Sequence, residues 1–324
     1  MSRWLLRRIL QAAVTFAVVL LLLFFLLRLS PGDPLARITG DRAVSPQELA
    51  QLRARFGLDQ PLLRQLGAFL GGLARGDLGV SIEHYPERVT SLLRARLPAT
   101  LLLGGTVLLL NFSLGAWLGV RQAVRRGSRF DRWLTRLALA AYATPSFWLG
   151  LVLVALVSIR WHLLPAAQMR DPLIAPDAGA LARGVDVLRH LILPALTLSL
   201  TSLALPLRHQ RAAMLASFRL DFVTAARARG LTERSVRWRH AWRTTLVPML
   251  TLLGLWLPIL VSGSVFVESV FNWPGLGSLA ADAIAARDYP VLLGSAMLVS
   301  AAVVLAGLLA DLGYALVDPR VRPT

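Results

Sequence analysis

The stretch that decides the fold class is ILQAAVTFAVVLLLLFFLL, which occupies Ile9–Leu27 and carries no charged side chain. A helix needs about 20 apolar residues to cross the hydrocarbon core of a bilayer. A helix on the surface of a soluble protein would show polar side chains at helical spacing, and the LLLLFFLL part of this run (Leu20–Leu27) has none. We therefore expect a transmembrane helix here.

The same run also resembles a secretory signal peptide, because Arg3, Arg7 and Arg8 precede it. The apolar part of a signal peptide is shorter, about 7–15 residues, and ends at a cleavage site with small residues. Here LRLSPGDP follows the run instead. We interpret Ile9–Leu27 as a retained helix.

Five further apolar runs lie along the chain, which has 324 residues, is 56% hydrophobic and only 16% charged, and has a mean hydropathy of +0.59. The runs are Leu97–Val120, Leu137–Ile159, Leu191–Leu207, Thr244–Val267 and Tyr289–Ala310. The third of these is short and holds two prolines, so we expect a kink or a buried position there. Together the runs predict an all-α membrane protein with six transmembrane helices.

The arginines indicate the orientation of these helices. If the N-terminus is inside, the inner segments hold 20 arginines and the short outer segments hold five. The outer connection 30–96 adds nine, but connections longer than about 60 residues are largely exempt from the positive-inside rule. We therefore predict a multi-pass membrane protein with both termini in the cytoplasm, and the segment from Arg121 to Arg136 as a cytoplasmic connection.

The composition excludes several kinds of chemistry. There is no cysteine and no lysine, and all 35 basic residues are arginine. A Walker-A phosphate loop and a Schiff-base enzyme both require lysine. If ATP drives this protein, another chain must bind it. The net charge of +17 could indicate nucleic acid binding, but the arginines cluster between apolar runs, which favours membrane topology. The five histidines show no ligand spacing, so we expect no metal site.

Two connections are too long to be simple links. The outer one, Ser30–Arg96, contains Ser45-Pro46-Gln47-Glu48, the pattern of a helix start with Ser45 as N-cap and Glu48 completing a capping box. We predict an external helical cap between the first two transmembrane helices.

The inner connection, Arg208–Arg243, contains Asp221-Phe-Val-Thr-Ala-Ala-Arg-Ala-Arg-Gly230-Leu-Thr-Glu-Arg-Ser235. Asp221 can cap a helix, Gly230 suits a left-handed stop, and Thr232 can start a second helix. The pattern predicts a helix–glycine–helix elbow. A solvated basic loop at the lipid headgroups is the alternative that the pattern alone leaves open.

Ordered motifs then run along nearly the whole chain. They are LLRLSPGDP (Leu26–Pro34), RFGLDQPL (Arg55–Leu62), GDLGVS (Gly76–Ser81), LPATLLL (Leu97–Leu103), TPSFWLGL (Thr144–Leu151), HLILPALTLSL (His190–Leu200), Ala225-Ala226-x-x-x-Gly230 followed by Leu246-Val247-Pro248, ESVFNWPGLG (Glu268–Gly277), RDYPVLLG (Arg287–Gly294) and DLGYALVDPRVR (Asp311–Arg322). With these motifs the chain resembles the oligopeptide/dipeptide subfamily of binding-protein-dependent ABC importer permeases. The inner connection resembles their "EAA" loop, with Thr224 at the position of the glutamate, so any ion pair of that glutamate is lost.

The resemblance implies a type I ABC importer permease fold and a set of partners. These are a homologous second permease, two ABC ATPase subunits that bind the ATP and Mg²⁺, an extracytoplasmic substrate-binding protein, and the lipid bilayer, with no nucleic acid. It implies no catalytic residue and no cofactor in this chain. The expected organisation is an N-terminal helix with the external cap over residues 1–96, a permease core over 97–317 with its coupling loop at 208–243, and a cytoplasmic tail at 318–324.

The resemblance also places the contact with the ATPases in the elbow. By position, Gly230, Leu231, Thr232, Glu233 and Arg234 are expected to form the contact. Thr224 stands before it, and Ala225 and Ala226 are expected to pack behind.

A peptide carries charges and amides, so polar residues within the spans are candidates for its path. The candidates are Asn111, Thr144, Ser146, Ser262 and Ser264, and the alternative is that such residues join helices to each other. Pro145 and Pro258 are expected either to break helices or only to kink them.

Glu268, Asp282 and Asp288 are candidates for an outer gate or a contact with the binding protein, and charges at headgroup level are the alternative. The pattern Gly275-x-Gly277-x-x-Ala280 imitates a dinucleotide fingerprint, but it has no βαβ setting, and we reject that reading.

Other functions fit less well. An intramembrane serine protease would need a serine–histidine pair at one depth, and the histidines fall outside or at the edges of the apolar runs. A secondary transporter working without ATP would usually show inverted repeats or a buried acid within a span. Within the resembled family, a nickel chelate, glutathione or an oligosaccharide is the alternative to di- and oligopeptides as substrate.

Overall fold

The computed structural model describes residues 2–29, 35, 45–175, 177, 179–262 and 264–317. Over these residues the chain is helical, with a single isolated β-bridge between Val80 and Arg88 and no strand. The predicted tail 318–324 and most of the LSPGDP motif lie outside the described residues. So does the side chain of Ser262, one of the pathway candidates, although its backbone ends a helix.

Four helices are long and apolar enough to cross a membrane, counting only the described part of the chain. Within α1 (Ser2–Leu29) and α15 (Tyr289–Val317), the apolar spans are Leu6–Leu29 and Tyr289–Leu308; the other two helices are α5 (Val89–Val124) and α8 (Ala180–Ser202). α5 runs without a break through the predicted domain boundary between residues 96 and 97.

The predicted span Leu137–Ile159 is not one straight helix. α6 (Arg129–Ala143) and α7 (Ser146–Leu153), which continues as a π-helix η1 (Val154–Arg160), meet at an angle of 101°. The break falls at Thr144, whose backbone is extended. Proline disfavours the helical conformation of the residue before it, so Pro145 accounts for this break. If the bent pair is one span, the described residues offer five.

The predicted span Leu191–Leu207 is also divided. α8 ends at Ser202 and α9 (Ala204–Ser217) begins two residues later, after Leu203. Pro206 lies in the first turn of α9, where the missing N–H of proline has no helical partner to lose.

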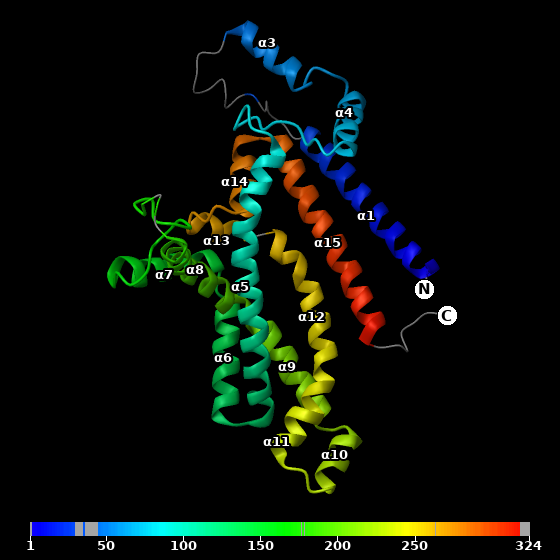
Figure 1. Cartoon of the computed structure of the whole chain (residues 1–324), viewed down its shortest axis with the longest axis vertical. Coiled ribbons are helices and arrows are strands. Elements are labelled where there is room, and N and C mark those ends of the chain that lie inside the picture. The colour runs from blue at the N-terminus through cyan, green and yellow to red at the C-terminus, as the bar shows by residue number, and fades with distance from the viewer. Residues whose placement is uncertain are drawn as a thin grey trace.

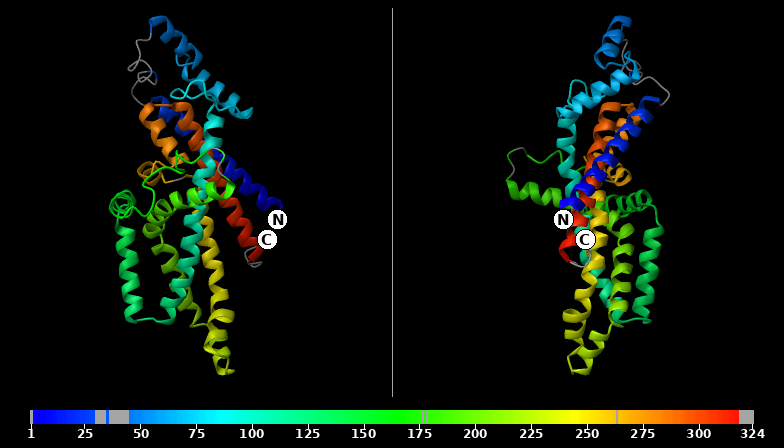
Figure 2. Two further views of the ribbon diagram at one scale, coloured as in Figure 1. Left: turned by 60° about the vertical axis from the view of Figure 1, so that its left-hand side comes forward. Right: turned by 90° about the vertical axis from the view of Figure 1, so that its right-hand side faces the viewer.

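α5 is the central helix and packs most closely against α9 (Figures 1 and 2). Two glycines allow the contact. A Cβ on Gly115 would lie 3.0 Å from the Cβ of Pro206, and one on Gly119 would lie 2.7 Å from the carbonyl oxygen of Leu207. Small residues four apart on one helix face let two backbones approach in this way.

α12 (Trp242–Ser262) runs beside α5, α9 and α15. It is followed by two short helices, α13 (Val265–Val270) and α14 (Leu276–Ala286), which pack against each other near the start of α5 and of α15 (Figure 1). This connection between α12 and α15 forms one wall of the site described below.

The two long connections lie at opposite ends of the molecule (Figure 1). α3 (Pro46–Arg55) and α4 (Leu62–Ala74) lie with α14 at one end, here named the cap end. The capping box of Ser45 and Glu48 is confirmed: Ser45 Oγ accepts from Glu48 N at 3.2 Å, and Glu48 Oε2 accepts from Ser45 N at 3.0 Å. α10 (Asp221–Ala228), α11 (Glu233–Ser235) and a π-helix η2 (Val236–Ala241) lie at the other, named the elbow end.

Candidate functional site

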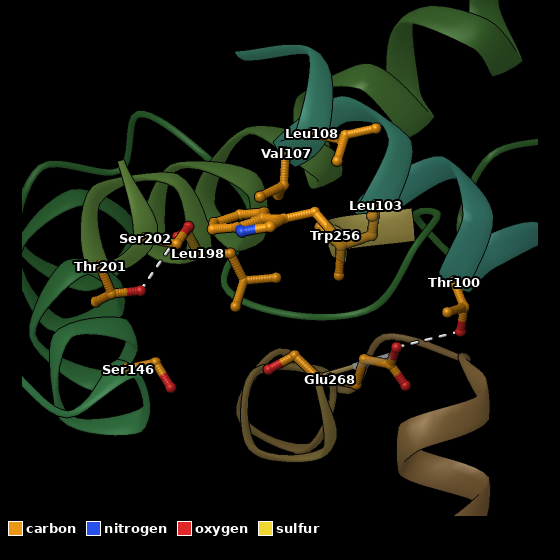
Figure 3. A pocket seen from close by; sticks show the side chains of 12 residues that line it. Thr100, Leu103, Val107, Leu108, Ser146, Leu198, Thr201, Ser202, Trp256 and Glu268 are labelled. Carbon is orange, nitrogen blue, oxygen red and sulfur yellow. Dashed lines mark hydrogen bonds between the residues drawn. The ribbon is translucent and has the colours of Figure 1, made fainter. Parts of the chain in front are cut away.

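A pocket of about 340 Å³ opens within the helical bundle (Figure 3). It is lined by residues from α5, α7, α8, α12 and the start of α13, namely Thr100, Leu103, Gly104, Val107, Leu108, Ser146, Leu198, Thr201, Ser202, Trp256, Ser264 and Glu268. Most of the wall is apolar, with a few hydroxyl groups and one carboxylate. Pockets of this size and character hold small molecules, whose orientation is fixed by a few polar groups.

Two of the five predicted pathway residues line this pocket. Ser146 begins α7 directly after the break at Pro145, and Ser264 is the N-cap of α13. Both therefore lie where a helix starts, so their placement follows from the interruptions of the two helices. Ser146 reaches the pocket because the chain changes direction at Pro145, and a straight helix over the same run would not include this change of direction.

Asn111 and Thr144 do not line the pocket. Asn111 is fully buried on α5, one turn beyond Val107 and Leu108, and its Nδ2 donates to Ser202 Oγ at 2.6 Å. Its Oδ1 is buried without a hydrogen-bond partner. Thr144 is partly exposed and donates to the carbonyl oxygen of Ala140 at 2.8 Å. Thr144 therefore uses its hydroxyl within its own helix, whereas Asn111 joins two helices beside the pocket.

Glu268 occupies one wall of the pocket rather than an outer surface. It is 0% exposed, and it accepts from Thr100 Oγ1 at 3.1 Å (Figure 3). It also accepts from the backbone N–H of Ser278 at 2.9 Å. Thr100 Oγ1 in turn accepts from Leu276 N at 2.7 Å. The carboxylate thus connects α13 to both α5 and α14.

The glycines of the PGLG sequence make room for this carboxylate. A Cβ on Gly277 would lie 2.8 Å from Glu268 Oε2 and 2.9 Å from the backbone nitrogen of Val265. A Cβ on Gly275 would overlap the same carboxylate. Close approach of a side chain therefore explains this Gly-x-Gly pattern, in agreement with the rejection of a dinucleotide fingerprint.

Trp273 fixes the same segment to α5. It is 0% exposed, and its Nε1 donates to the carbonyl oxygen of Ala99 at 2.9 Å. A backbone carbonyl oxygen has two lone pairs, so Ala99 can accept this bond without losing its bond within α5. The neighbouring apolar residues Leu103 and Leu191 complete the packing around the indole.

The three predicted gate residues do not form one cluster. Asp282 is exposed on α14, and Asp288 is 1% exposed just before α15. Asp288 accepts from the backbone N–H of Ile82 at 3.0 Å and of Glu83 at 3.1 Å, and from the hydroxyl of Ser81. Asp288 therefore holds the GDLGVS segment onto the start of α15.

The elbow, residues 221–235, has the predicted helix–glycine–helix form. Gly230 has φ +77°, which confirms the left-handed stop, and its N–H donates to the carbonyl oxygen of Arg227 at 2.9 Å. Thr232 Oγ1 accepts from Ser235 N at 3.4 Å, as expected of an N-cap. The prediction for Asp221 is wrong: it is the first residue of α10, and no side chain caps that helix.

The elbow rests on a small apolar cluster. Val223 and Ala226 are fully buried and pack with Val120, Met214 and Val236. Ala225 is exposed, so only Ala226 of the predicted pair packs behind the turn. The spacing of three residues between Val223 and Ala226 puts both on one face of α10, toward α5 and α9.

The expected contact residues point outward. Thr224, Gly230, Leu231, Thr232, Glu233 and Arg234 are all exposed. Leu231 is an apolar side chain exposed at the tip, and Glu233 is held by Arg227 at 3.0 Å. The arrangement offers a rigid turn with an apolar centre and charged flanks, which suits contact with another protein.

An ion pair that the sequence analysis missed stabilises the elbow end. Asp131, in the first turn of α6, accepts from Arg211 Nε and Nη2, both at 2.8 Å. Gly127 N also donates to Asp131, at 3.0 Å. Asp131 is 4% exposed, so these hydrogen bonds pair a buried carboxylate with the guanidinium of Arg211. Asp131 is the only acid in the arginine-rich segment 121–136, and that isolation was the available signal.

The described residues contain no group of three His, Cys, Asp or Glu side chains that could hold a metal ion. The described residues instead form a pocket within the bundle, a wall of that pocket held by the hydrogen bonds of Glu268, and an elbow whose turn faces outward.

Comparison with known proteins gives consistent matches over the whole chain. The model of the family described as "Binding-protein-dependent transport system inner membrane component" matches residues 111–323, and its N-terminal companion matches residues 1–104. The chain is 37% identical to the dipeptide transport system permease protein DppB of Escherichia coli K12, over 99% of each chain. It is 40% identical to the di/tripeptide transport system permease protein DppB of Pseudomonas aeruginosa, over 95% of each. It is also 34% identical to the oligopeptide transport system permease protein AppB of Bacillus subtilis, over 99% of this chain and 100% of that one.

Proposed function

Because the chain belongs to the family of binding-protein-dependent transport system inner membrane components, we propose that it is a permease subunit of an ATP-driven ABC importer of short peptides. The observation that carries the proposal is the similarity, over the full length, to permeases named for dipeptides, di/tripeptides and oligopeptides. The chain has no lysine for a nucleotide-binding loop, so ATP and Mg²⁺ are assigned to partner ATPase subunits.

The proposed topology has six spans in the inner membrane and both termini in the cytoplasm. α1, α5, α8 and α15 supply four spans. The bent pair of α6 and α7 supplies the third span in chain order, and α12 supplies the fifth. The excess of arginines in the predicted inner segments supports placing the elbow end in the cytoplasm and the cap end outside.

The pocket in the bundle is proposed as this chain's half of the translocation pathway. A peptide exposes amide groups, and the hydroxyls of Ser146, Thr201 and Ser264 offer partners to them. The unpaired Oδ1 of Asn111 lies next to this wall and can accept from a peptide N–H after a small rearrangement. A homologous second permease is proposed to supply the other half, as a heterodimer.

The elbow is proposed as the coupling element that docks into the ATPase subunits. Leu231 is the apolar centre of the contact, and Thr232, Glu233 and Arg234 flank it. Val223 and Ala226 fix the back of the elbow to α5 and α9, so a movement of the ATPase is transmitted to helices that line or flank the pocket. Thr224, at the position of the family's glutamate, is exposed and adds no charge to the contact.

ATP binding is proposed to open the pathway to the outside and hydrolysis to close it. A substrate-binding protein then delivers the peptide at the cap end. Direction follows from access to one pocket that alternates between the two sides, because each nucleotide state favours one conformation.

The proposal is tested by affinity purification of the full chain from its native membrane, followed by reconstitution with the subunits that accompany it. We expect an ATPase to co-purify and labelled dipeptide to accumulate in vesicles only when ATP and the binding protein are present. Uphill transport by this chain without an ATPase would overturn the coupling proposal and favour a secondary transporter.

Substrate class is tested separately, with the ligand carried by the partner binding protein. Mass spectrometry of that protein as purified is expected to reveal short peptides. A nickel chelate, glutathione or an oligosaccharide in their place would keep the permease assignment and replace the substrate.

A further inference from the structure

A second pocket, of about 290 Å³, lies at the cap end, where the C-terminal end of α1 meets α4 and the start of α15. Phe24 of α1 is 1% exposed and stacks on Phe69 of α4, with ring centroids 5.8 Å apart. Leu293 of α15 adds to the apolar wall. This contact holds α4 against the first span, and the pocket lies beside it.

The charge in this pocket is mainly positive. Arg28 and Arg64 both line it, and Asp77 is the acid among the lining residues. Asp77 Oδ1 accepts from the backbone N–H of Gly79 at 3.0 Å, and no ion pair joins Asp77 to either arginine in the described chain. The pocket therefore favours an anion.

Arg28 is the more unusual of the two arginines. Its guanidinium lies 5.8 Å from the centroid of the Phe24 ring and 5.7 Å from that of the Tyr289 ring. Its Nε is buried and has no hydrogen-bond partner. Cation–π contacts leave the N–H groups of a guanidinium free to donate in its plane. A buried N–H of this kind requires an acceptor, because burial without one is costly.

Gln65, in the same pocket, lacks a hydrogen-bond donor, whereas Arg28 lacks an acceptor. Its Nε2 donates to the carbonyl oxygens of Gln60 at 2.7 Å and Leu58 at 3.3 Å. Its Oε1 is buried without a donor. The site thus needs a ligand that combines an anionic acceptor with a hydroxyl or ammonium donor. A phosphodiester headgroup such as glycerol phosphate or ethanolamine phosphate has both.

The surroundings favour a lipid over a soluble ligand. α4 is a short apolar helix without a buried residue, and Leu63 and Leu70 on it are exposed, a pattern that suits a helix lying at a membrane surface. On α1, Leu22 and Leu26 are exposed in the turns before Arg28, toward the middle of the span, and they offer an apolar surface for an acyl chain. Arg28, near the end of the span Leu6–Leu29, stands at the depth of the headgroups.

We propose that this pocket binds the headgroup of a phospholipid, with Arg28 and Arg64 donating to the phosphate and Gln65 Oε1 accepting from the headgroup. The lipid then joins α4 of the cap to the first span. That this lipid belongs to the outer leaflet follows only from the proposed topology, which places the cap end outside. The binding itself requires neither transport nor ATP.

The test uses the full chain in detergent, with the subunits that accompany it, and dioctanoyl phosphatidylglycerol as the probe. The shift of the unfolding midpoint with lipid concentration gives a Kd. We expect Arg64→Gln to raise that Kd about fivefold, since one basic side chain at a membrane surface contributes about 1 kcal/mol, and Arg28→Gln to raise it further. The matched control is Arg75→Gln, an exposed arginine at the end of α4 that does not line the pocket and should leave the Kd unchanged.

Three results would overturn the proposal. One is an equal Kd for Arg64→Gln and Arg75→Gln, which would indicate unspecific adsorption of lipid. Another is the same stabilisation by inorganic phosphate at equal concentration, which would make this a free-anion site. The third is displacement of the lipid by a dipeptide, which would place the pocket in the transport path. If Arg28→Gln does not fold, the exposed Arg64 decides the question alone.

Discussion

The connecting segments at the two ends of the molecule are held in different ways. At the cap end, Glu268 and Asp288 are 0% and 1% exposed, and both accept hydrogen bonds from backbone N–H groups. At the elbow end, the turn around Gly230 is held from behind by Val223 and Ala226, and the residues of the turn point outward. Polar groups that already have hydrogen-bond partners inside the chain are not available to another protein. An exposed apolar side chain, in contrast, can be buried by binding one. The difference indicates a framework at the cap end and is consistent with the docking role proposed above for the elbow.

The largest expected effect tests the framework. Gly277→Ala should lower the free energy of unfolding by about 2–4 kcal/mol, because the added Cβ would lie 2.8 Å from Glu268 Oε2 and 2.9 Å from the Val265 nitrogen. Unfolding of the purified chain in detergent measures this. Gly67→Ala in α4 is the control, since a Cβ there meets nothing within 4 Å and should be neutral or stabilising by about 0.5–1 kcal/mol. Equal effects of the two substitutions would contradict the clamped wall.

The next prediction compares matched glycines at the two ends. Gly57 and Gly230 each lie just after a helix, and each has a positive φ. The N–H of each glycine donates to the carbonyl oxygen of the residue three positions earlier. Proline cannot adopt positive φ and lacks the N–H, at a cost of about 3 kcal/mol or more. Gly230→Pro should reduce the peptide transported per ATP hydrolysed about 100-fold in reconstituted vesicles. Gly57→Pro should strain the cap end equally and leave that ratio unchanged. A similar fall in both variants would remove the distinction between the ends.

The sequence predicted best what depends on near neighbours. The capping box at Ser45, the left-handed Gly230 and the N-cap Thr232 were all found because each motif involves residues at most four apart, and the local geometry allows few alternatives. For Pro145 the sequence left a break and a kink equally open, and the structure shows a break. The 101° bend was not predicted, because packing against other helices determines the direction in which a broken helix continues.

Contacts between distant residues could not be predicted in this way. The hydrogen bond from Thr100 to Glu268 joins residues 168 positions apart, and the ion pair of Arg211 with Asp131 joins residues 80 apart. Nothing in the sequence near Glu268 shows that it turns inward, so a carboxylate after an apolar run was interpreted as a gate. The arginines around Asp131 predict on which side of the membrane the segment lies, but they do not identify Arg211, 80 residues away, as the partner of its carboxylate.

A smaller effect is expected from the apolar centre of the elbow. Leu231→Glu should weaken association with the ATPase subunits about 30-fold, because burying a leucine contributes about 1.5–3 kcal/mol. The free energy of unfolding of the variant chain should change by less than about 0.5 kcal/mol, since Leu231 is 38% exposed. Binding of the purified ATPase to the immobilised complex measures this. Leu173→Glu, at a position 90% exposed elsewhere, is the control. Unchanged binding for Leu231→Glu would move the docking surface away from the elbow.

The smallest effect concerns the ion pair of Asp131 with Arg211 at the elbow end. The ion pair with Arg211 exists only while Asp131 is ionised, so its contribution to the stability of the folded chain is present at neutral pH and is lost as the carboxyl group is protonated. Asp131→Asn should cost about 1–2 kcal/mol at pH 7, less than a fully buried pair because Arg211 remains partly exposed. Unfolding of wild type and variant between about pH 6 and 3 should show the two converging only at the acid end. If they differ equally at every pH, the loss arises from packing of the side chain, and the elbow end has no electrostatic clamp comparable with the hydrogen bonds of the cap end.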